Sequence, residues 1–362
     1  MEIIAFYLPQ YHPTPHNNEW WGEGFTEWTN VAKAKPLFRG HYQPKVPADL
    51  GFYDLRMPEV REKQAKLAVE AGITGFCYYH YWFGNGEQEL ELPFNEVVKS
   101  GNPDFPFCLC WANESWYKKF WNKDGGVTDK KELAVQVYPG EADDVEHFNS
   151  LLSAFRDKRY IRINGKLLFM VYKPLQIPEP KKFMELWRKL AKDNDVDDFI
   201  FVGFTFNPDT EYNTILELGY DAVASCRLGY GKQGFLMTAL RKIISLVVDK
   251  PMTFNYKTIY PTLISTLEKE KSNAFPTMIP NWDHTPRSGN HGYLYTNSTP
   301  NLFEKHAEQV LEAVKDKPSD AQVCFVKSWN EWGEGNYLEP DLKYGKGYIY
   351  ALRKAIKTVF NQ

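Results

Sequence analysis

Near its C-terminus the chain reads Val323-Cys-Phe-Val-Lys-Ser-Trp-Asn-Glu-Trp-Gly-Glu-Gly335. Residues 323–328 form a short apolar run with β-branched and aromatic members, which predicts a buried strand. Two carboxylates, Glu331 and Glu334, follow this run at once, between tryptophans and glycines. A buried strand that ends in this way predicts a functional site at its carboxyl end.

The spacing of Glu331 and Glu334 suits paired chemistry. If the chain turns helically there, residues three apart share one face. One carboxylate of such a pair is expected to act as an acid and the other as a base or nucleophile. Trp329 and Trp332 offer flat apolar faces of the kind on which sugar rings stack, and the amide of Asn330 suits a sugar hydroxyl. The alternative is a solvated Glu-x-x-Glu at a helix start, where the helix dipole favours acids.

The rest of the chain alternates between apolar strand-like runs and helical patterns. The predicted strands are residues 3–8, 73–79, 105–111, 166–172, 199–204, 222–226, 275–280 and 323–328. The predicted helices are residues 58–71, 93–99, 143–158, 180–193, 210–218, 262–271, 301–315 and 347–360. Eight strands alternating with helices predict an α/β fold of the (β/α)8 barrel type. The near-continuous apolar runs fit strands buried on both faces.

The length of 362 residues allows two domains, but α/β barrels of this size are common, and we expect one catalytic domain over residues 1–362. Residues 17–49 are too long for a plain connection, so they are predicted to form an active-site loop. Residues 229–261 are a second predicted insertion, with an apolar helix at 236–248. That helix belongs either to the core or to a membrane interface.

In a (β/α)8 barrel the functional groups gather where the strands end. Polar side chains do follow the predicted strands, namely His12, His80, Glu114, Asn207, Asp283 and Glu331. Glu114 closes Trp111-Ala-Asn-Glu114, which resembles Trp329-Asn-Glu331. Glu114 is therefore a third catalytic candidate, because glycoside hydrolysis needs carboxylates that face each other. An ion pair with Lys118 or Lys119 is the alternative.

The seventh predicted strand ends in Asn281-Trp-Asp-His-Thr-Pro-Arg287. Asp283 is expected to hold sugar hydroxyls, and Arg287 either pairs with Asp283 or binds a charged substituent. The alternative is that the two residues only brace a loop. For His12 and His80, hydroxyl binding and loop hydrogen bonding both stay open.

Composition excludes several classes of function. The net charge of -3, without a charge block, does not indicate a nucleic acid or an anionic membrane surface as partner. No zinc spacing and no glycine-rich phosphate loop occur, so no metal or cofactor is predicted. The aromatic content of 16%, with 11 Trp and 22 Tyr, instead favours an oligosaccharide or polysaccharide substrate.

Five cysteines lie mostly inside apolar runs, which predicts free core thiols and a reducing compartment. Neither a signal peptide nor an 18-residue apolar span is recognised. We therefore expect a cytoplasmic protein without stable membrane insertion. The oligomeric state is not predicted.

Several motifs resemble the WbsX-type proteins of polysaccharide and lipopolysaccharide O-antigen gene clusters, which are labelled glycosyltransferases. These motifs are Ala5-Phe-Tyr-Leu-Pro-Gln-Tyr-His12, Phe25-Thr-Glu-Trp28, Trp111-Ala-Asn-Glu114 and Ser328-Trp-Asn-Glu-Trp-Gly-Glu-Gly335. The resemblance covers essentially the whole chain. The candidate substrate-binding residues are Tyr7, His12, Trp28, His80, Trp111, Asn113, Asp283, Arg287, Trp329, Asn330 and Trp332.

The chain is also similar, more distantly, to glycoside hydrolase family 99, the endo-α-mannosidases and endo-α-mannanases. Their Asn-Glu-Trp-x-Glu-Gly pattern matches Asn330 to Gly335. This resemblance implies that Glu331 is a base assisting the 2-hydroxyl of the substrate, with retention through an epoxide-like intermediate. It implies that Glu334 is the acid/base at the leaving oxygen.

The leading hypothesis is a glycoside hydrolase that cleaves an α-linked glycan, with mannose as one possible unit. A glycosyltransferase or transglycosylase of cell-surface polysaccharide assembly is the first alternative. A non-catalytic glycan-binding barrel is the second.

Overall fold

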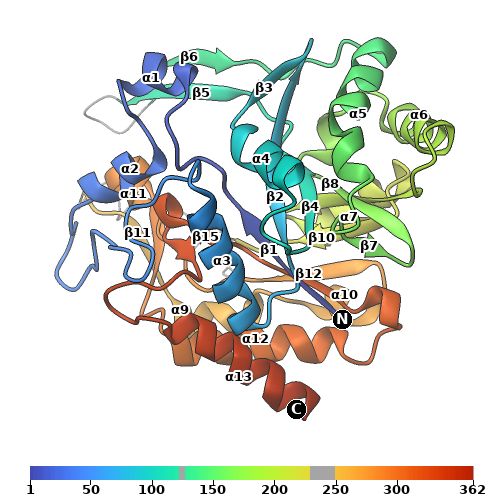
Figure 1. Ribbon diagram of the computed structural model, residues 1–362. Helices are drawn as coiled ribbons and strands as arrows, with labels where there is room; N and C mark the ends of the chain where they lie inside the picture. The colour runs from blue at the N-terminus through green and yellow to red at the C-terminus, as the bar shows by residue number, and fades with distance from the viewer. Residues whose placement is uncertain (122–126, 229–248, 362) are drawn as a thin grey trace.

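The computed structural model describes residues 1–121, 127–228 and 249–361, and its centre is a closed barrel of eight parallel strands (Figure 1). The barrel strands are β1 (Glu2–Tyr7), β2 (Gly75–Gly84), β4 (Phe107–Trp111), β8 (Lys166–Val171), β9 (Phe199–Thr205), β10 (Ala222–Ser225), β12 (Ala274–Met278) and β14 (Val323–Val326). β1 pairs with both β2 and β14, which closes the ring. The predicted (β/α)8 barrel is confirmed.

An outer layer of helices surrounds the barrel. Its members are α3 (Pro58–Ala71), α4 (Leu92–Ser100), α5 (Glu141–Phe155), α6 (Pro180–Asp193), α7 (Pro208–Glu217), α10 (Thr266–Glu270), α12 (Pro300–Val314) and α13 (Gly347–Phe360). The predicted bounds of α3, α6 and α13 are confirmed to the residue. α3 shows why, since it starts at Pro58, whose ring suits the first turn, and is capped after Ala71 by Gly72 with a φ of 89°.

The predicted active-site loop over residues 17–49 contains two short helices, α1 (Pro15–Trp21) and α2 (Glu27–Lys33). Helices of two turns give too few residues for a periodic signal. Their caps are local, however, because the side chains of Thr14 and Thr26 accept hydrogen bonds from the first turn of each helix. α2 packs against the turn that carries Glu334, so the insertion does reach the predicted site.

Beyond the barrel, several short strands were not predicted. β2 runs on to Gly84, five residues past the predicted end, and its outer part pairs with β3 (Glu87–Glu89). A hairpin of β5 (Trp116–Trp121) and β6 (Val127–Ala134) follows β4 and lies beside α1 at the top of Figure 1. These elements lie at one end of the barrel, where the strands finish. The predicted helix 236–248 lies outside the described residues.

The remaining elements are short. They are β7 (Arg162–Ile163), β11 (Met252–Asn255), β13 (Tyr293–Thr296), β15 (Asn330–Glu331), β16 (Asn336–Tyr337), α9 (Tyr256–Ile259), α11 (Thr285–Ser288) and the 3-10 turns η1 (Pro174–Gln176), η2 (Tyr260–Thr262), η3 (Gly289–His291), η4 (Ser319–Ala321) and η5 (Trp332–Glu334). The predicted helix 262–271 is shorter than expected, since only η2 and α10 form there.

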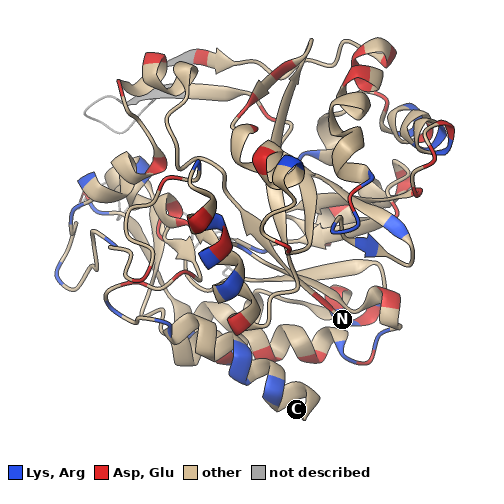
Figure 2. Ribbon diagram, viewed as in Figure 1, with Lys and Arg blue, Asp and Glu red and all other residues tan. Residues whose placement is uncertain are grey.

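The thiols and charges agree with the sequence. All five cysteines are free and buried, as predicted, and both Cys108 and Cys110 contact Cys77, which places them on one face of β4. Acidic and basic residues both occur over much of the ribbon in Figure 2. Within the described residues, no helix has the length and apolar content to cross a bilayer.

Candidate active site

A cavity of about 800 Å³, called here the front cavity, opens where the barrel strands end. Its floor and walls come from the segments after nearly every barrel strand and from α2. Among its lining residues are Gln10, Glu27, Tyr79, Tyr81, Glu114, Trp116, Tyr172, Phe206, Trp282, His284, Arg287, Lys327, Glu331 and Glu334. The volume lies within the range of about 300–1,000 Å³ common to small-ligand sites.

The two central carboxylates stand on a tight hairpin that follows β14. β15 pairs with β16, and η5 forms the turn between them, with Gly335 at a φ of 60°. Asn330 fastens the hairpin to the end of β1, because its amide oxygen accepts from Leu8 N at 2.7 Å and its amide nitrogen donates to Leu8 O at 3.0 Å. The hairpin thus fixes Glu331 and Glu334 relative to the barrel.

The packing under the hairpin is aromatic. Trp332 stacks on Tyr337 with ring centroids 3.8 Å apart, and its indole N–H donates to Glu339 at 2.6 Å. Tyr53 and Gln64 donate to the same carboxyl group at 2.9 and 2.7 Å. Burial nevertheless raises the pKa of Glu339 to about 7. A buried acid that forms no salt bridge with any described residue therefore lies directly behind the candidate site.

Glu331 is buried and paired with a cation from its own strand end. Lys327 Nζ lies 3.0 Å from its Oε2, and the Ser328 hydroxyl donates to the same oxygen. Lys327 also donates to the hydroxyl of Tyr79 at 2.8 Å. Burial opposes the charge on Lys327, but Glu331 together with Tyr172, Glu334 and Cys226 outweighs burial, and the pKa of this lysine lies above its usual value. Lys327 is therefore charged at neutral pH.

Glu334 has a different cation. Arg287 Nη1 donates to its Oε1 at 2.5 Å, and Arg287 Nε donates to Glu27 Oε1 at 2.9 Å. His284 Nε2 lies 3.6 Å from the same oxygen of Glu334. One guanidinium thus bridges two carboxylates, and the group of three carries one negative charge in excess. The predicted pairing of Arg287 with Asp283 is wrong, because the structure gives it Glu27 and Glu334 instead.

Glu27 occupies a space that is open only because residue 333 is a glycine. It is 2% exposed, and a Cβ added at Gly333 would lie 1.7 Å from its Oε1. The same Cβ would lie 3.1 Å from Arg287 Nε. The absence of a side chain at Gly333 therefore lets α2 place its carboxylate against the turn.

Glu114 lies at the rim of the front cavity. Its side chain is 45% exposed, and Lys173 Nζ lies 3.4 Å from Oε2. The neighbouring Asn113 is buried and structural, since it donates to Lys173 O at 3.0 Å and accepts from Lys173 N at 2.8 Å. The loop amide thus positions the rim, while Glu114 itself faces the cavity.

Most of the other predicted substrate-binding residues do not line the front cavity. They are buried behind its wall, where they pack or hold the backbone, and they are Tyr7, His12, Trp28, His80, Trp111, Asn113, Trp329, Asn330 and Trp332. The indoles of Trp28 and Trp111 donate to the backbone oxygens of Tyr53 and Trp82 at 2.7 and 2.9 Å. Their positions correct the prediction that these residues contact substrate.

The histidines are also internal. His12 Nδ1 lies 3.0 Å from Pro9 O, which is the loop hydrogen bond left open as an alternative. His80 Nε2 lies 2.8 Å from His147 Nε2, and burial lowers the pKa of His80 to about 3. A neutral imidazole pair inside the barrel wall contributes packing rather than a ligand contact.

Asp283 lies outside the front cavity too. It accepts from Gln43 at 2.7 Å and from the Thr285 hydroxyl at 2.6 Å, and His41 Nε2 lies 2.9 Å away. Burial would raise the pKa of Asp283, but Lys45, His41 and Thr285 lower it to about 2. The carboxylate therefore braces the loop, but through His41, Gln43 and Thr285 rather than through the Asp283–Arg287 pair considered from the sequence.

The aromatic walls of the front cavity come from residues that the sequence motifs did not identify as substrate-binding. They are Trp21, Phe25, Tyr79, Tyr81, Trp116, Tyr117, Tyr172, Phe206 and Trp282. Only Tyr172 and Phe206 directly follow a barrel strand, after β8 and β9, so the others share no common signal in the sequence. No group of three or more possible metal ligands occurs among the described residues.

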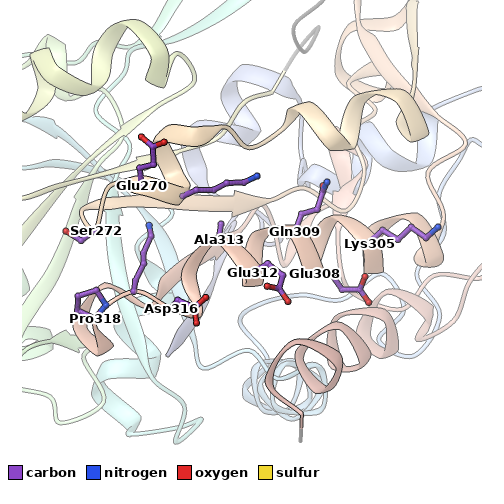
Figure 3. Close-up of a pocket in the computed structure, with 11 residues that line it drawn as sticks. Glu270, Ser272, Lys305, Glu308, Gln309, Glu312, Ala313, Asp316 and Pro318 are labelled. Atoms are coloured by element: carbon purple, nitrogen blue, oxygen red, sulfur yellow. The ribbon is translucent and has the colours of Figure 1, made fainter.

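A separate hollow of about 630 Å³ lies along α10 and α12 (Figure 3). Its residues include Ser272 and Pro318, which precede β12 and β14, so it is at the amino end of the barrel strands. Its lysines and acids are mixed along the groove. Barrel chemistry is found at the opposite end, so we assign this hollow no part in the candidate site.

Comparison with solved structures shows the class of fold. A structure titled "Glycoside hydrolase-like protein" has a TM-score of 0.61 at 15% identity, covering 98% of this chain and 93% of that one. The endo-alpha-mannosidase of glycoside hydrolase family 99 from Bacteroides thetaiotaomicron, in complex with Bis-Tris-propane, has a TM-score of 0.56 at 17% identity, covering 99% and 96%. The barrel is thus the one used by these glycoside hydrolases.

Sequence comparison then gives the family. The family described as "Glycosyltransferase WbsX" matches residues 3–352, and the chain belongs to it. Two proteins named "Uncharacterized protein WxcX", from Xanthomonas campestris pv. campestris strains B100 and ATCC 33913, are each 34% identical over 98% of this chain. The chain spans about half the length of these relatives, since it covers 49% of each.

Proposed function

We propose that this barrel is a glycan-processing enzyme, and specifically a glycoside hydrolase that cleaves an α-linked glycan in the front cavity. The observation that carries the proposal is the pair Glu331 and Glu334, which line one cavity from one hairpin but have separate cations. Two carboxyl groups at the scissile bond are what glycoside hydrolysis requires. The family 99 fold supports the same assignment.

The surroundings of the two carboxylates suit different roles. Glu331 is matched one to one by Lys327, so it is suited to act as the base that draws a proton from the substrate. The attacking group would be the 2-hydroxyl of the sugar. A second displacement at the same carbon would follow, so that the configuration of that carbon is retained overall. Glu334 shares Arg287 with Glu27 and lines the same cavity as Glu331. Glu334 is therefore assigned as the acid at the leaving oxygen.

The remaining groups bind rather than react. Glu114, half exposed at the rim, is suited to accept hydrogen bonds from sugar hydroxyls further along the glycan. The aromatic walls offer apolar faces to sugar rings. Apolar walls with a few convergent polar groups are the usual design of a ligand site.

Glycosyl transfer is the second candidate, because the family description reads "Glycosyltransferase". A transferase needs an activated donor, whereas hydrolysis needs water alone. The discriminating experiment is a glycan screen on purified protein, with and without nucleotide sugars, and with reducing ends read by mass spectrometry.

Sugar release by the wild type without nucleotide, absent in Glu334→Gln, is the expected result. Chain extension only when a nucleotide sugar is added would replace hydrolysis by transfer. Glycan binding without any product would instead indicate a barrel that only binds its ligand.

A further inference from the structure

A second pocket of about 400 Å³ lies behind the candidate site, and we call it the rear pocket. Asn281 and Asp283 line it, while their neighbours Trp282 and His284 line the front cavity. Residues 281–284 therefore form a wall between the two cavities, with alternate residues lining each one. The other contributors include residues 38–42, Lys45, β13 and the loop after β16.

The carboxylates of the rear pocket are already satisfied. Asp283 receives the hydrogen bonds from Gln43 and Thr285 given above. Asp341 accepts from the Tyr337 hydroxyl at 2.7 Å and from Tyr344 N at 2.6 Å. Both acids therefore have protein donors, and Asp283 also lies within ion-pair distance of Lys45.

The donors of the rear pocket are under-used. Lys45 is 4% exposed, and among the described residues its Nζ lies 3.3 Å from Gly335 O, 3.9 Å from Asp283 and 5.7 Å from the centroid of the Tyr337 ring. Lys343 Nζ lies over the rings of Tyr42 and Tyr344, at 4.6 and 4.9 Å from their centroids. Such a cation keeps its N–H donors for a ligand.

Two further donors border the same space. The Arg39 guanidinium lines the rear pocket, and no described residue forms a salt bridge with it. Tyr348 is 4% exposed, and its buried hydroxyl has no hydrogen-bond partner among the described residues. Unpaired buried polar groups cost free energy unless a ligand or water satisfies them.

We propose that the rear pocket binds a sugar that carries an anionic substituent, either a carboxylate or a phosphate. Lys45, Lys343 and Arg39 would hold the anion, since donors outnumber available acceptors there. The volume lies within the range of small-ligand sites. This site does not depend on which reaction the front cavity performs.

The test is isothermal titration of the full chain with three probes, namely glucuronate, glucose 6-phosphate and glucose. At least one anionic sugar should bind, about tenfold or more tighter than glucose, as charge-assisted hydrogen bonds imply. Whichever anionic probe binds identifies the substituent. Equal affinity for all three probes, or no binding, overturns the proposal.

Variants locate the bound probe. The double variant Arg39→Gln with Lys343→Gln removes two exposed cations and should weaken binding about tenfold or more. The matched control is Lys305→Gln, which removes an exposed lysine of the other hollow (Figure 3) and should leave affinity within about twofold. Unchanged binding in the double variant overturns the proposal.

Two more variants separate the pockets. Glu331→Gln and Glu334→Gln alter the front cavity only, so binding of the anionic probe should persist in both. Loss of binding in either one would mean that the probe occupies the front cavity, which overturns the proposal. Because the readout is binding and not turnover, a failed hydrolase assignment would not affect it.

Discussion

Replacing Gly333 by alanine should lower turnover in the front cavity without changing either proposed catalytic carboxylate. The new Cβ would lie 1.7 Å from Glu27 Oε1, a separation that no pair of non-bonded atoms tolerates. Glu27 must therefore move by more than an ångström, which breaks its 2.9 Å hydrogen bond to Arg287. Arg287 is then no longer held where it positions Glu334.

The expected size follows from the lost contact. A hydrogen bond between charged groups is worth about 1.5–3 kcal/mol. If the whole effect falls on the transition state, kcat/KM decreases about 10- to 150-fold. Overpacking should also lower the free energy of unfolding by about 1–3 kcal/mol. Turnover of the glycan found by the screen and a urea unfolding curve measure the two effects.

A second substitution should relieve the clash between residue 333 and Glu27. Glu27→Asp shortens the side chain by one methylene and vacates the space beside residue 333. The double variant Gly333→Ala with Glu27→Asp should therefore be more active than Gly333→Ala alone. Turnover of Gly333→Ala within about twofold of the wild type would refute the argument. So would a double variant no better than the single one.

Three further predictions concern the residues around the site. Lys327→Met leaves the buried carboxylate of Glu331 without its partner at 3.0 Å and should cost about 3–5 kcal/mol in urea unfolding, whereas Lys315→Met, which breaks an exposed pair with Glu312, should cost less than about 1 kcal/mol. Glu339 has its pKa raised from 4.5 to about 7, so its contribution to stability is full below pH 4.5 and is lost as the pH rises to about 7. The wild type should lose about 3 kcal/mol over that window relative to Glu339→Gln, and parallel pH profiles of unfolding would contradict this. Trp116→Ala should raise KM while the protein stays folded, because Trp116 lines the front cavity, whereas Trp28→Ala should cost about 3–5 kcal/mol of stability; equal thermal stability of the two variants would contradict the assignment.

The barrel could be predicted from the sequence because its signals are local. Each strand is an apolar run, and helices such as α3 begin at proline and end before glycine. Glu331 and Glu334 were found for a related reason, since a buried strand that ends in acids is unusual. The residues that follow each strand can therefore be identified from the sequence.

The partners of those acids were not predicted, because they depend on tertiary structure. Glu27 and Arg287 meet across 260 positions of sequence, and α2 is too short to show its face by periodicity. Lys327 was counted as part of an apolar strand, although it supplies the cation of Glu331.

The direction in which each tryptophan points could not be predicted from the sequence either. An indole after a strand points either into the cavity or behind its wall, and one residue of difference decides which. Trp282 lines the front cavity, whereas its neighbour Asp283 lines the rear pocket. Trp111 and Trp332 are turned inward, where their N–H groups have internal acceptors.

The most direct test of the account compares turnover in three amide variants of matched size, Glu331→Gln, Glu334→Gln and Glu114→Gln. The account predicts that the first two lose about 10²- to 10⁴-fold in kcat, the usual worth of a positioned acid or base. Glu114→Gln should mainly raise KM, because its carboxylate is at the rim. Folded Glu331→Gln or Glu334→Gln protein that keeps its turnover within tenfold of the wild type would contradict the central claim.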